Sequence, residues 1–91
     1  MLKKMEDSKS KNAVAIKYSS DLPAPIIVAS GKGGLAEIIQ NIARNHQIQI
    51  LEDEVLVENL IEFKSGTFIP EEFYPIVAEL LTFVSGLTIE R

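Results

Sequence analysis

Residues 13–43 read AVAIKYSSDLPAPIIVASGKGGLAEIIQNIA and place two strand patterns directly before a helix pattern. In the first strand pattern, Val14, Ile16 and Tyr18 alternate with other residues, as they do along one face of a strand. Residues 25–29 (PIIVA) form a β-branched run that is typical of a strand buried on both faces. The loop between the two is short and rich in turn-forming residues, so we expect the strands to pair antiparallel.

The glycine-rich stretch Ser30–Gly34 ends the second strand and precedes a helix. Apolar residues then recur with the period of a helix and predict one buried stripe: Leu35, Ile38, Ile39, Ile42 and Ala43. The opposite side of this helix carries Glu37, Gln40, Asn41 and Arg44. Residues 47–50 alternate again and predict a third strand. A strand, helix and strand in this order indicate a right-handed parallel crossover.

The second half of the chain predicts two more helices. Asp53 is placed to cap a helix that runs to about Phe63, whose buried face is expected to be Leu56, Val57, Leu60 and Ile61. The last helix opens at Pro70 and stops at Gly86, with a core stripe of Phe73, Ile76, Val77, Leu80 and Val84. Pro75 lacks an N–H and crowds the preceding turn, so we expect a kink or an irregular first turn there.

The expected fold is α/β (mixed α+β): a small mixed sheet of about three strands with three to four packed helices. The length of 91 residues indicates a single domain. We assign residues 1–12 to a polar tail or short helix, 13–86 to the domain, and 87–91 to a C-terminal tail.

Composition excludes several classes of protein. The chain has no cysteine, which rules out disulfides and thiolate zinc sites. Its net charge of −4 gives no general attraction to phosphate, so we expect no nucleic-acid partner. Membrane helices require about 20 consecutive apolar residues, and the sequence has neither such a run nor a secretory signal. We therefore expect a cytoplasmic protein that reaches membranes through partners only.

Few residues suggest catalysis. The Gly31–Gly34 turn lies where phosphate loops occur, but it matches neither the Walker A nor the dinucleotide pattern. His46 is the single histidine and lies near the end of a predicted helix, where it favours the helix dipole. In the acidic triplet Glu52–Glu54, helix capping is a better account than metal binding. We expect no enzyme, no cofactor and no metal, with a nucleotide-binding turn as the least favoured alternative.

Three segments resemble the cytoplasmic domain of the FlhB family, the substrate-switch proteins of flagellar and related type III secretion systems. They are AVAIKY at 13–18, PAPIIVASGKGGLAEIIQNIA at 23–43 and IPEEFYPIVAELLTFV at 69–84. The first resembles the strand after the family's self-cleavage site, and the others resemble its AP-x-VVAKG strand and helix and its closing helix. The resemblance runs from about residue 12 to residue 84.

The resemblance implies a binding module. The family's hydrophobic substrate-docking patch maps onto Ala24 and Pro25 before the second strand, and onto Ala78 and Leu81 in the last helix. The expected partners are export-gate proteins and secreted flagellar or type III substrates. A free regulatory module acting outside secretion is the alternative. The family's strand before the cleavage site is missing, so the 13–18 strand is expected to have an open edge for self-association unless residues 1–11 cover it.

The family's cleavage motif is NPTH, in which the asparagine side chain cyclises and breaks the chain. The equivalent positions here are Ser8, Lys9, Ser10 and Lys11. Ser8 has no amide that could form a succinimide, and Lys9 provides no proline turn. We therefore predict no autocleavage. Mass spectrometry of the purified chain after prolonged incubation should give a single species of 10.1 kDa, and a fragment beginning at residue 9 would contradict this prediction.

Overall fold

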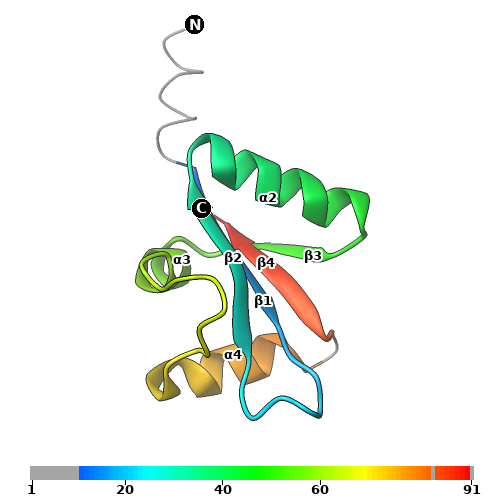
Figure 1. Cartoon of the computed structure of the whole chain (residues 1–91), viewed down its shortest axis with the longest axis vertical. Helices are drawn as coiled ribbons and strands as arrows, with labels where there is room; N and C mark the ends of the chain where they lie inside the picture. Colours follow the sequence, from blue (N-terminus) through cyan, green and yellow to red (C-terminus); the bar gives the residue numbers. More distant parts are fainter. Residues whose placement is uncertain (1–10, 83, 91) are drawn as a thin grey trace, which may run out of the picture.

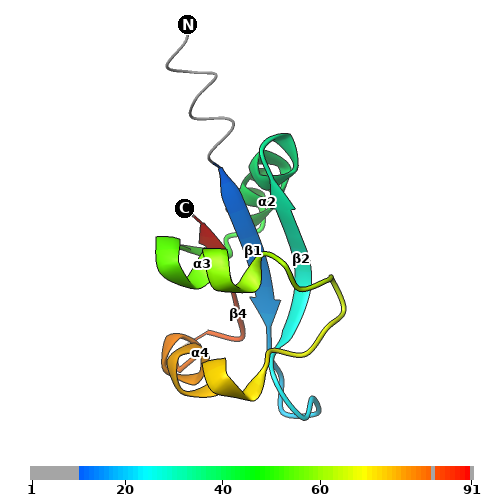
Figure 2. The ribbon, with the colours of Figure 1, turned by 90° about the vertical axis from the view of Figure 1, so that its left-hand side faces the viewer.

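The computed structural model describes residues 11–82 and 84–90. They form a four-stranded sheet in the order β2-β1-β4-β3, with helices on both faces (Figures 1 and 2). The strands are β1 (Asn12–Lys17), β2 (Ile26–Lys32), β3 (Gln49–Glu52) and β4 (Gly86–Glu90). The helices are α2 (Gly34–Asn45), α3 (Glu54–Leu60) and α4 (Tyr74–Leu80), and the 3-10 turn η1 (Glu71–Phe73) precedes α4. The mixed α+β class is confirmed.

β1 is antiparallel to β2 on one side and to β4 on the other, and β3 runs parallel to β4. The predicted antiparallel pairing of the first two strands is therefore confirmed, with a bulge between Ala15 and Ile16. Since β2 and β4 both oppose β1, the strands β2 and β3 point the same way. The parallel sense of the β2-α2-β3 connection is thus confirmed, although it joins the two edges of the sheet and not two neighbours.

The C-terminal tail expected over residues 87–91 is wrong for residues 87–90, which belong to β4. β4 lies inside the sheet, between β1 and β3, and adds the fourth strand. Leu87, Thr88 and Ile89 are all buried there. A run of five residues gives a weak strand signal by itself, and its partners lie far away in the sequence.

The open edge expected for the 13–18 strand is also wrong, because β1 has a partner strand on each side. The sheet edges are β2 and β3 instead. Residues 66–69 cover the outer side of β2: the Ile27 N–H donates to the Thr67 carbonyl at 2.9 Å, and the Ile69 N–H donates to the Pro25 carbonyl at 2.8 Å. Such covering reduces edge-to-edge association.

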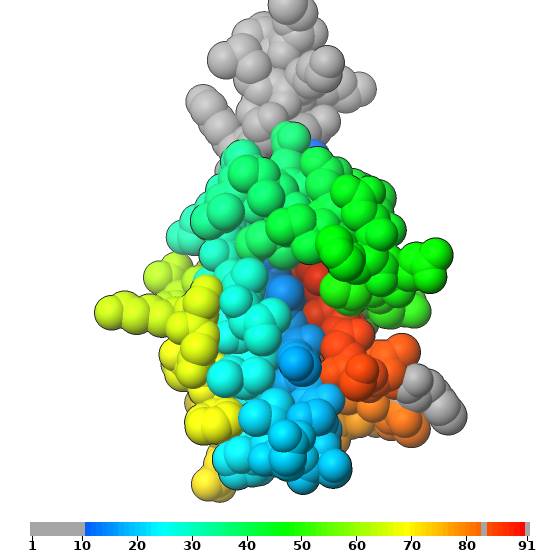
Figure 3. All heavy atoms as spheres, turned by 45° about the vertical axis from the view of Figure 1, so that its right-hand side comes forward, coloured from blue at the N-terminus to red at the C-terminus, as the bar shows by residue number. Residues whose placement is uncertain are grey.

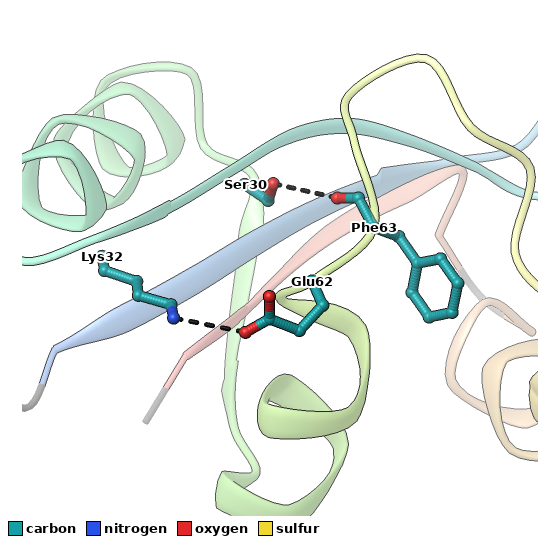
Figure 4. A network of polar contacts seen from close by, with 4 residues as sticks. All are labelled: Ser30, Lys32, Glu62 and Phe63. Carbon is teal, nitrogen blue, oxygen red and sulfur yellow. Dashed lines mark hydrogen bonds and ion pairs between the residues drawn. The ribbon is translucent and has the colours of Figure 1, made fainter.

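Side chains from the C-terminal half of β2 contact the chain that follows α3 (Figure 4). The Ser30 hydroxyl donates to the Phe63 carbonyl at 3.2 Å. Lys32 Nζ lies 3.3 Å from a carboxylate oxygen of Glu62, an exposed ion pair that adds little stability. The backbone of residues 66–69 thus covers the start of β2, and two side-chain contacts link its later part to the chain after α3.

The main core lies between the sheet and the helices α3 and α4. It combines side chains of β1, β2, β4, α3 and α4 with Ile69 from the segment before η1: Val14, Ile16, Ile27, Leu56, Val57, Leu60, Ile69, Val77, Leu87 and Ile89. The other face of the sheet carries α2 and a smaller cluster of Ala13, Ala36 and Ile39 (Figure 2). The larger share of hydrophobic stabilisation thus comes from the α3 and α4 side.

The stripe predicted for α2 is only partly buried. Ile39 and Ala43 face the sheet as expected, but Leu35, Ile38 and Ile42 are 51%, 55% and 51% exposed. Ala36 and Gln40 are buried in their place. The sheet beneath presents the small side chains Ala13, Ala15 and Ala29. A helix approaches such a surface closely through its own small residues, which turns the large ones outward. Val28 of β2 is 48% exposed because it borders the part of this face that α2 leaves uncovered, so burial of the second strand on both faces is wrong.

The last helix predicted to reach Gly86 ends at Leu80, and Ile76 of its expected core stripe is 43% exposed, so both of these predictions are wrong. Two local signals in α3 and α4 are confirmed. The Asp53 carboxylate accepts a hydrogen bond from the Leu56 N–H at 3.0 Å and caps α3. Pro75 lies in the first turn of α4, where its missing N–H has no intrahelical partner to lose. The 3-10 turn η1 comes directly before it, which is the irregular start expected from Pro75.

The contrast between the two faces of α3 gives a stability test. Leu60 is 0% exposed and Val55 is 71% exposed. Leu60→Ala should lower the free energy of unfolding by about 2–5 kcal/mol, because it leaves a cavity in the main core. Val55→Ala should change it by less than about 0.5 kcal/mol. Urea unfolding followed by circular dichroism measures both, and equal effects would contradict this core assignment.

Candidate functional site

A cavity of about 310 Å³ opens between the loop before β2 and the helix α4. It is lined by Tyr18, Pro23, Ala24, Pro25, Tyr74, Ala78 and Leu81. The structure therefore brings together all four patch residues expected from the sequence: Ala24, Pro25, Ala78 and Leu81. We call this feature the loop–α4 cavity.

The loop side of the cavity is held by backbone hydrogen bonds at both ends. The Tyr18 N–H donates to the Ser85 carbonyl at 2.8 Å, one residue beyond the β1–β4 ladder. The Pro25 carbonyl accepts from Ile69 at the other end of the loop. Pro23 and Pro25 restrict the backbone between these points. Ala24 between them is buried, so the loop presents a preformed wall.

The helix side is presented by the spacing of α4. Tyr74, Ala78 and Leu81 recur at i, i+4 and i+7 and so share one side of the helix. Val77 lies on a neighbouring side, fully buried in the main core. Burial of Val77 fixes the rotation of α4, and this rotation turns Ala78 toward the cavity. Leu81 closes the helix, with its N–H donating to the Val77 carbonyl at 2.9 Å.

The cavity suits an apolar ligand. Its lining contains no Asp, Glu, Lys, Arg or His side chain, and two tyrosines are its most polar members. Asp21 lies in the same loop as Pro23 and Ala24 but does not line the cavity. The Ser19 hydroxyl donates to the Asp21 carboxylate and, with a backbone hydrogen bond and nearby Lys17, holds the pKa of this exposed group below its ordinary value. The carboxylate is therefore ionised at neutral pH and remains in solvent.

The remaining candidates have structural explanations. Gly33 adopts a positive φ of 59° before α2. A side chain on Gly31 would meet Leu35 at 2.4 Å, so this glycine makes room for the first turn of α2. The Gly31–Gly34 turn does not line the loop–α4 cavity. His46 is the C-terminal cap residue of α2, as its position in the sequence indicates.

The acidic triplet does not gather into a metal site. Asp53 is engaged as the cap of α3. Among residues 11–82 and 84–90, no group of three or more His, Asp or Glu side chains is placed to hold a metal ion. In the same part of the chain, no helix has the length and apolar character needed to cross a bilayer.

The degenerate cleavage positions precede β1 in the sequence. Ser8, Lys9 and Ser10 fall outside the described residues. The Lys11 carbonyl accepts a hydrogen bond from the Gly33 N–H at 2.9 Å, and its Nζ lies 3.5 Å from a Glu37 oxygen. Absence of autocleavage stays a prediction.

A second, larger hollow of about 540 Å³ lies on the α2 face (Figure 3). Its floor is the part of β1 and β4 that α2 leaves uncovered, including Ala15, Lys17 and Thr88. Val28 and Ile48 form apolar borders, but Lys17, Gln47 and Gln49 make its walls more polar than those of the loop–α4 cavity. We therefore take the loop–α4 cavity as the candidate site.

Comparison with solved structures identifies the class of domain. The C-terminal domain of EscU, in a crystal structure of its Y316D mutant, matches with a TM-score of 0.77 and 27% identity over 82% of this chain and 93% of that chain. The H265A mutant of the same domain gives a TM-score of 0.75 and 26% identity, over 81% and 93% of the two chains.

Sequence comparison then gives the family. Residues 10–84 match the FlhB HrpN YscU SpaS Family, and the chain belongs to this family. The resemblance to FlhB drawn from the sequence is confirmed. The flagellar biosynthetic protein FlhB of Helicobacter pylori (strain ATCC 700392 / 26695) is 40% identical over 80 residues, which cover 87% of this chain and 22% of that protein. YlqH of Bacillus subtilis (strain 168) is 35% identical over 83 residues, or 90% of this chain and 89% of YlqH.

The chain thus spans about a fifth of the length of the FlhB proteins that it matches, at 22% and 21% for the Helicobacter pylori and Bacillus subtilis proteins. YlqH, by contrast, is matched over nearly its full length. Chains of this size therefore occur in the family beside the long FlhB proteins.

Three lining residues of the cavity were not anticipated: Tyr18, Pro23 and Tyr74. Tyr18 follows the alternation of β1 and was predicted to share a strand face with Val14 and Ile16, but it lies beyond the strand and is 37% exposed. Tyr74 stands four residues before Ala78, a spacing that places both on one side of a helix. That signal was available in the sequence.

Val77 and Ala78 are neighbours on α4, but only Val77 is part of the main core. Substituting each in turn therefore distinguishes effects on folding from effects on the cavity. Val77→Lys should lower the free energy of unfolding by more than about 3 kcal/mol, because it places a charge in the main core. Ala78→Lys should change the free energy by less than about 0.5 kcal/mol, because this side chain is exposed. Urea unfolding of both variants checks this contrast. A large loss from Ala78→Lys would mean that α4 is rotated from the orientation described here.

Proposed function

We propose that this protein is a non-catalytic component of a flagellar or type III export apparatus, and that its loop–α4 cavity binds short apolar segments of export substrates or export-gate proteins. Family membership supports the general role. The observation that carries the finer proposal is the convergence of Ala24, Pro25, Ala78 and Leu81 on one cavity. These positions come from two distant segments of the chain and correspond to the family's docking patch.

The chemistry of the cavity supports a peptide ligand. Its volume of about 310 Å³ is at the lower end of the ~300–1,000 Å³ typical of small-ligand sites. This is room for one or two apolar side chains of an extended segment, not for a folded partner. Because the walls are held before binding, little conformational entropy is lost there on docking.

A site of this size implies weak and reversible binding. A small apolar contact buries less area than the 1,200–2,000 Å² or so typical of stable protein complexes. Weak binding suits a component that must release each exported chain. Position on the cytoplasmic side of the membrane, through contacts with membrane-embedded partners, belongs to the same proposal.

A domain swap tests the proposal. Residues 12–91 are placed after the membrane-spanning half of a truncated FlhB in a flagellated host, and filament number and hook length are measured. The fusion should restore export. The Ala78→Lys fusion, made at the same level, should reduce secreted hook and filament protein at least tenfold, because a charged chain fills the cavity. The matched control is Val55→Lys on α3, away from the cavity, which should export normally.

The domain swap tests the export role and the docking site separately. Equal export by the Ala78→Lys and unmodified fusions would contradict the docking site but not the export role. A stable fusion that exports nothing would contradict the export role and favour a regulatory module outside secretion. Normal hook length with the unmodified fusion would mean that substrate switching occurs without chain cleavage.

A further inference from the structure

Three glutamates accompany the helix wall of the loop–α4 cavity. Glu71 and Glu72 belong to the 3-10 turn η1, just before the lining residue Tyr74. Glu79 directly follows the lining residue Ala78. All three glutamates are exposed, and none of them lines the cavity itself. Each carboxylate therefore belongs to a residue at most three positions from an apolar or aromatic lining residue.

The loop wall adds a fourth carboxylate. Asp21 lies in the chain between the lining residues Tyr18 and Pro23, and it is exposed. The Ser19 hydroxyl donates a hydrogen bond to its carboxylate. Residues 18–25 contain no Lys, Arg or His side chain. Both walls of the cavity are thus formed by segments whose exposed charges are negative.

These carboxylates have no cationic partner within the described part of the chain. Residues 66–90, which include η1 and α4, contain no Lys, Arg or His. The ion pairs between described residues lie on other elements and join Lys11 to Glu37 and Lys32 to Glu62. The acidic side chains near the cavity are therefore free to meet charges on a ligand.

Two lysines precede or follow these segments in the sequence, but neither lines the cavity. Lys17 borders the hollow on the α2 face, although its charge contributes to the lowered pKa of Asp21. Lys64 comes before Gly66, whose N–H donates to the Ile27 carbonyl at 2.6 Å. It thus belongs to the segment that runs beside β2. The chain supplies no cation of its own to the lining of the cavity.

We infer that the occupant of the loop–α4 cavity is an apolar segment flanked by Lys or Arg side chains, a refinement that rests on the proposed docking function. The apolar side chains of the segment enter the cavity. Its flanking cations lie against the exposed carboxylates of Asp21, Glu71, Glu72 and Glu79. Charges at the rim of a binding site speed association and discriminate between partners, while the apolar contact holds the ligand.

The two tyrosines of the lining favour the same class of ligand. Tyr18 and Tyr74 are 37% and 38% exposed, so part of each side chain faces solvent. The face of an aromatic ring attracts a Lys or Arg cation. An acidic segment meets the opposite situation, because its carboxylates approach like charges on both walls. The site therefore rejects apolar segments with acidic flanks by repulsion, in addition to attracting those with basic flanks.

Titration with matched peptides tests this inference. Each peptide carries the apolar core Val-Leu-Val-Leu, with a pair of lysines, glutamines or glutamates at each end. Binding to the isotope-labelled full chain is followed by NMR at the amides of Tyr74 and Ala78, which suits weak complexes. At low salt the lysine peptide should bind about tenfold more tightly than the glutamate peptide, with the glutamine peptide between them. At about 1 M salt the Debye length falls to about 3 Å, and the difference should drop below about twofold.

Charge-neutralising variants of the full chain locate the effect. One variant combines the changes Glu71→Gln, Glu72→Gln and Glu79→Gln, which leave the cavity lining intact. In this variant the preference for the lysine peptide over the glutamate peptide should fall to about twofold, because only the loop carboxylate remains. A matched control changes the net charge equally and should keep the full preference. It alters acidic residues on other parts of the domain: Glu37→Gln, Glu52→Gln and Glu62→Gln.

The outcomes distinguish the inference from the proposed function. Equal binding of the three peptides at the cavity would overturn the charge selection but leave docking of apolar segments in place. Binding of none of them would contradict the docking function and the inference with it. Tight binding of a lysine peptide with a Ser-Gly-Ser-Gly core would overturn the inference, because charge alone would then explain binding. Equal loss of preference in both variants would also overturn it, since the net charge of the chain would then act without the rim.

Discussion

Strand β1 carries a backbone ladder on each side and side chains on each face, and both faces of the domain are arranged around it. Val14 and Ile16 point into the main core, while Ala13 and Ala15 form the flat surface on which α2 lies. Large and small residues alternate along β1, so its two faces differ. The large side chains pack against α3 and α4, and the small ones allow α2 to pack close to the sheet. Residues 13–17 of β1 have a partner strand on each side.

The candidate site depends on the same strand. The β1–β4 ladder continues one step past Lys17, where Tyr18 donates to Ser85, and the chain then turns into the loop that forms one wall of the cavity. The other wall is α4, whose rotation follows from the burial of Val77 against the sheet. Both walls are therefore positioned by the core. This arrangement suits recognition by preformed shape rather than by induced ordering.

The sequence predicted features that depend on neighbouring residues, such as helix caps. It did not predict which surfaces of the helices and the sheet pack against each other. The Asp53 cap and the irregular start at Pro75 depend on residues within one or two turns, and both were predicted correctly. The face of α2 was misjudged because periodicity assumes that the largest apolar residues point inward. The alanines of the sheet reversed this choice for Leu35, Ile38 and Ile42. β4 was missed because five residues carry little signal until their distant partners are known. The four patch positions were predicted from the family resemblance. No pattern in the local sequence indicates that they lie close together.

The antiparallel pairing of β1 and β4 has a mechanical consequence. Ala13 lies opposite Glu90, so the described chain enters and leaves at the same end of one ladder (Figure 1). A force that pulls these two ends apart loads the β1–β4 hydrogen bonds one after another, as in a zipper, and not all together in shear. Tension between the ends would therefore peel β4 from β1 at low load, although heat or denaturant must disrupt the whole core at once. Closely spaced ends also allow the domain to be inserted into another protein without spreading its flanking segments.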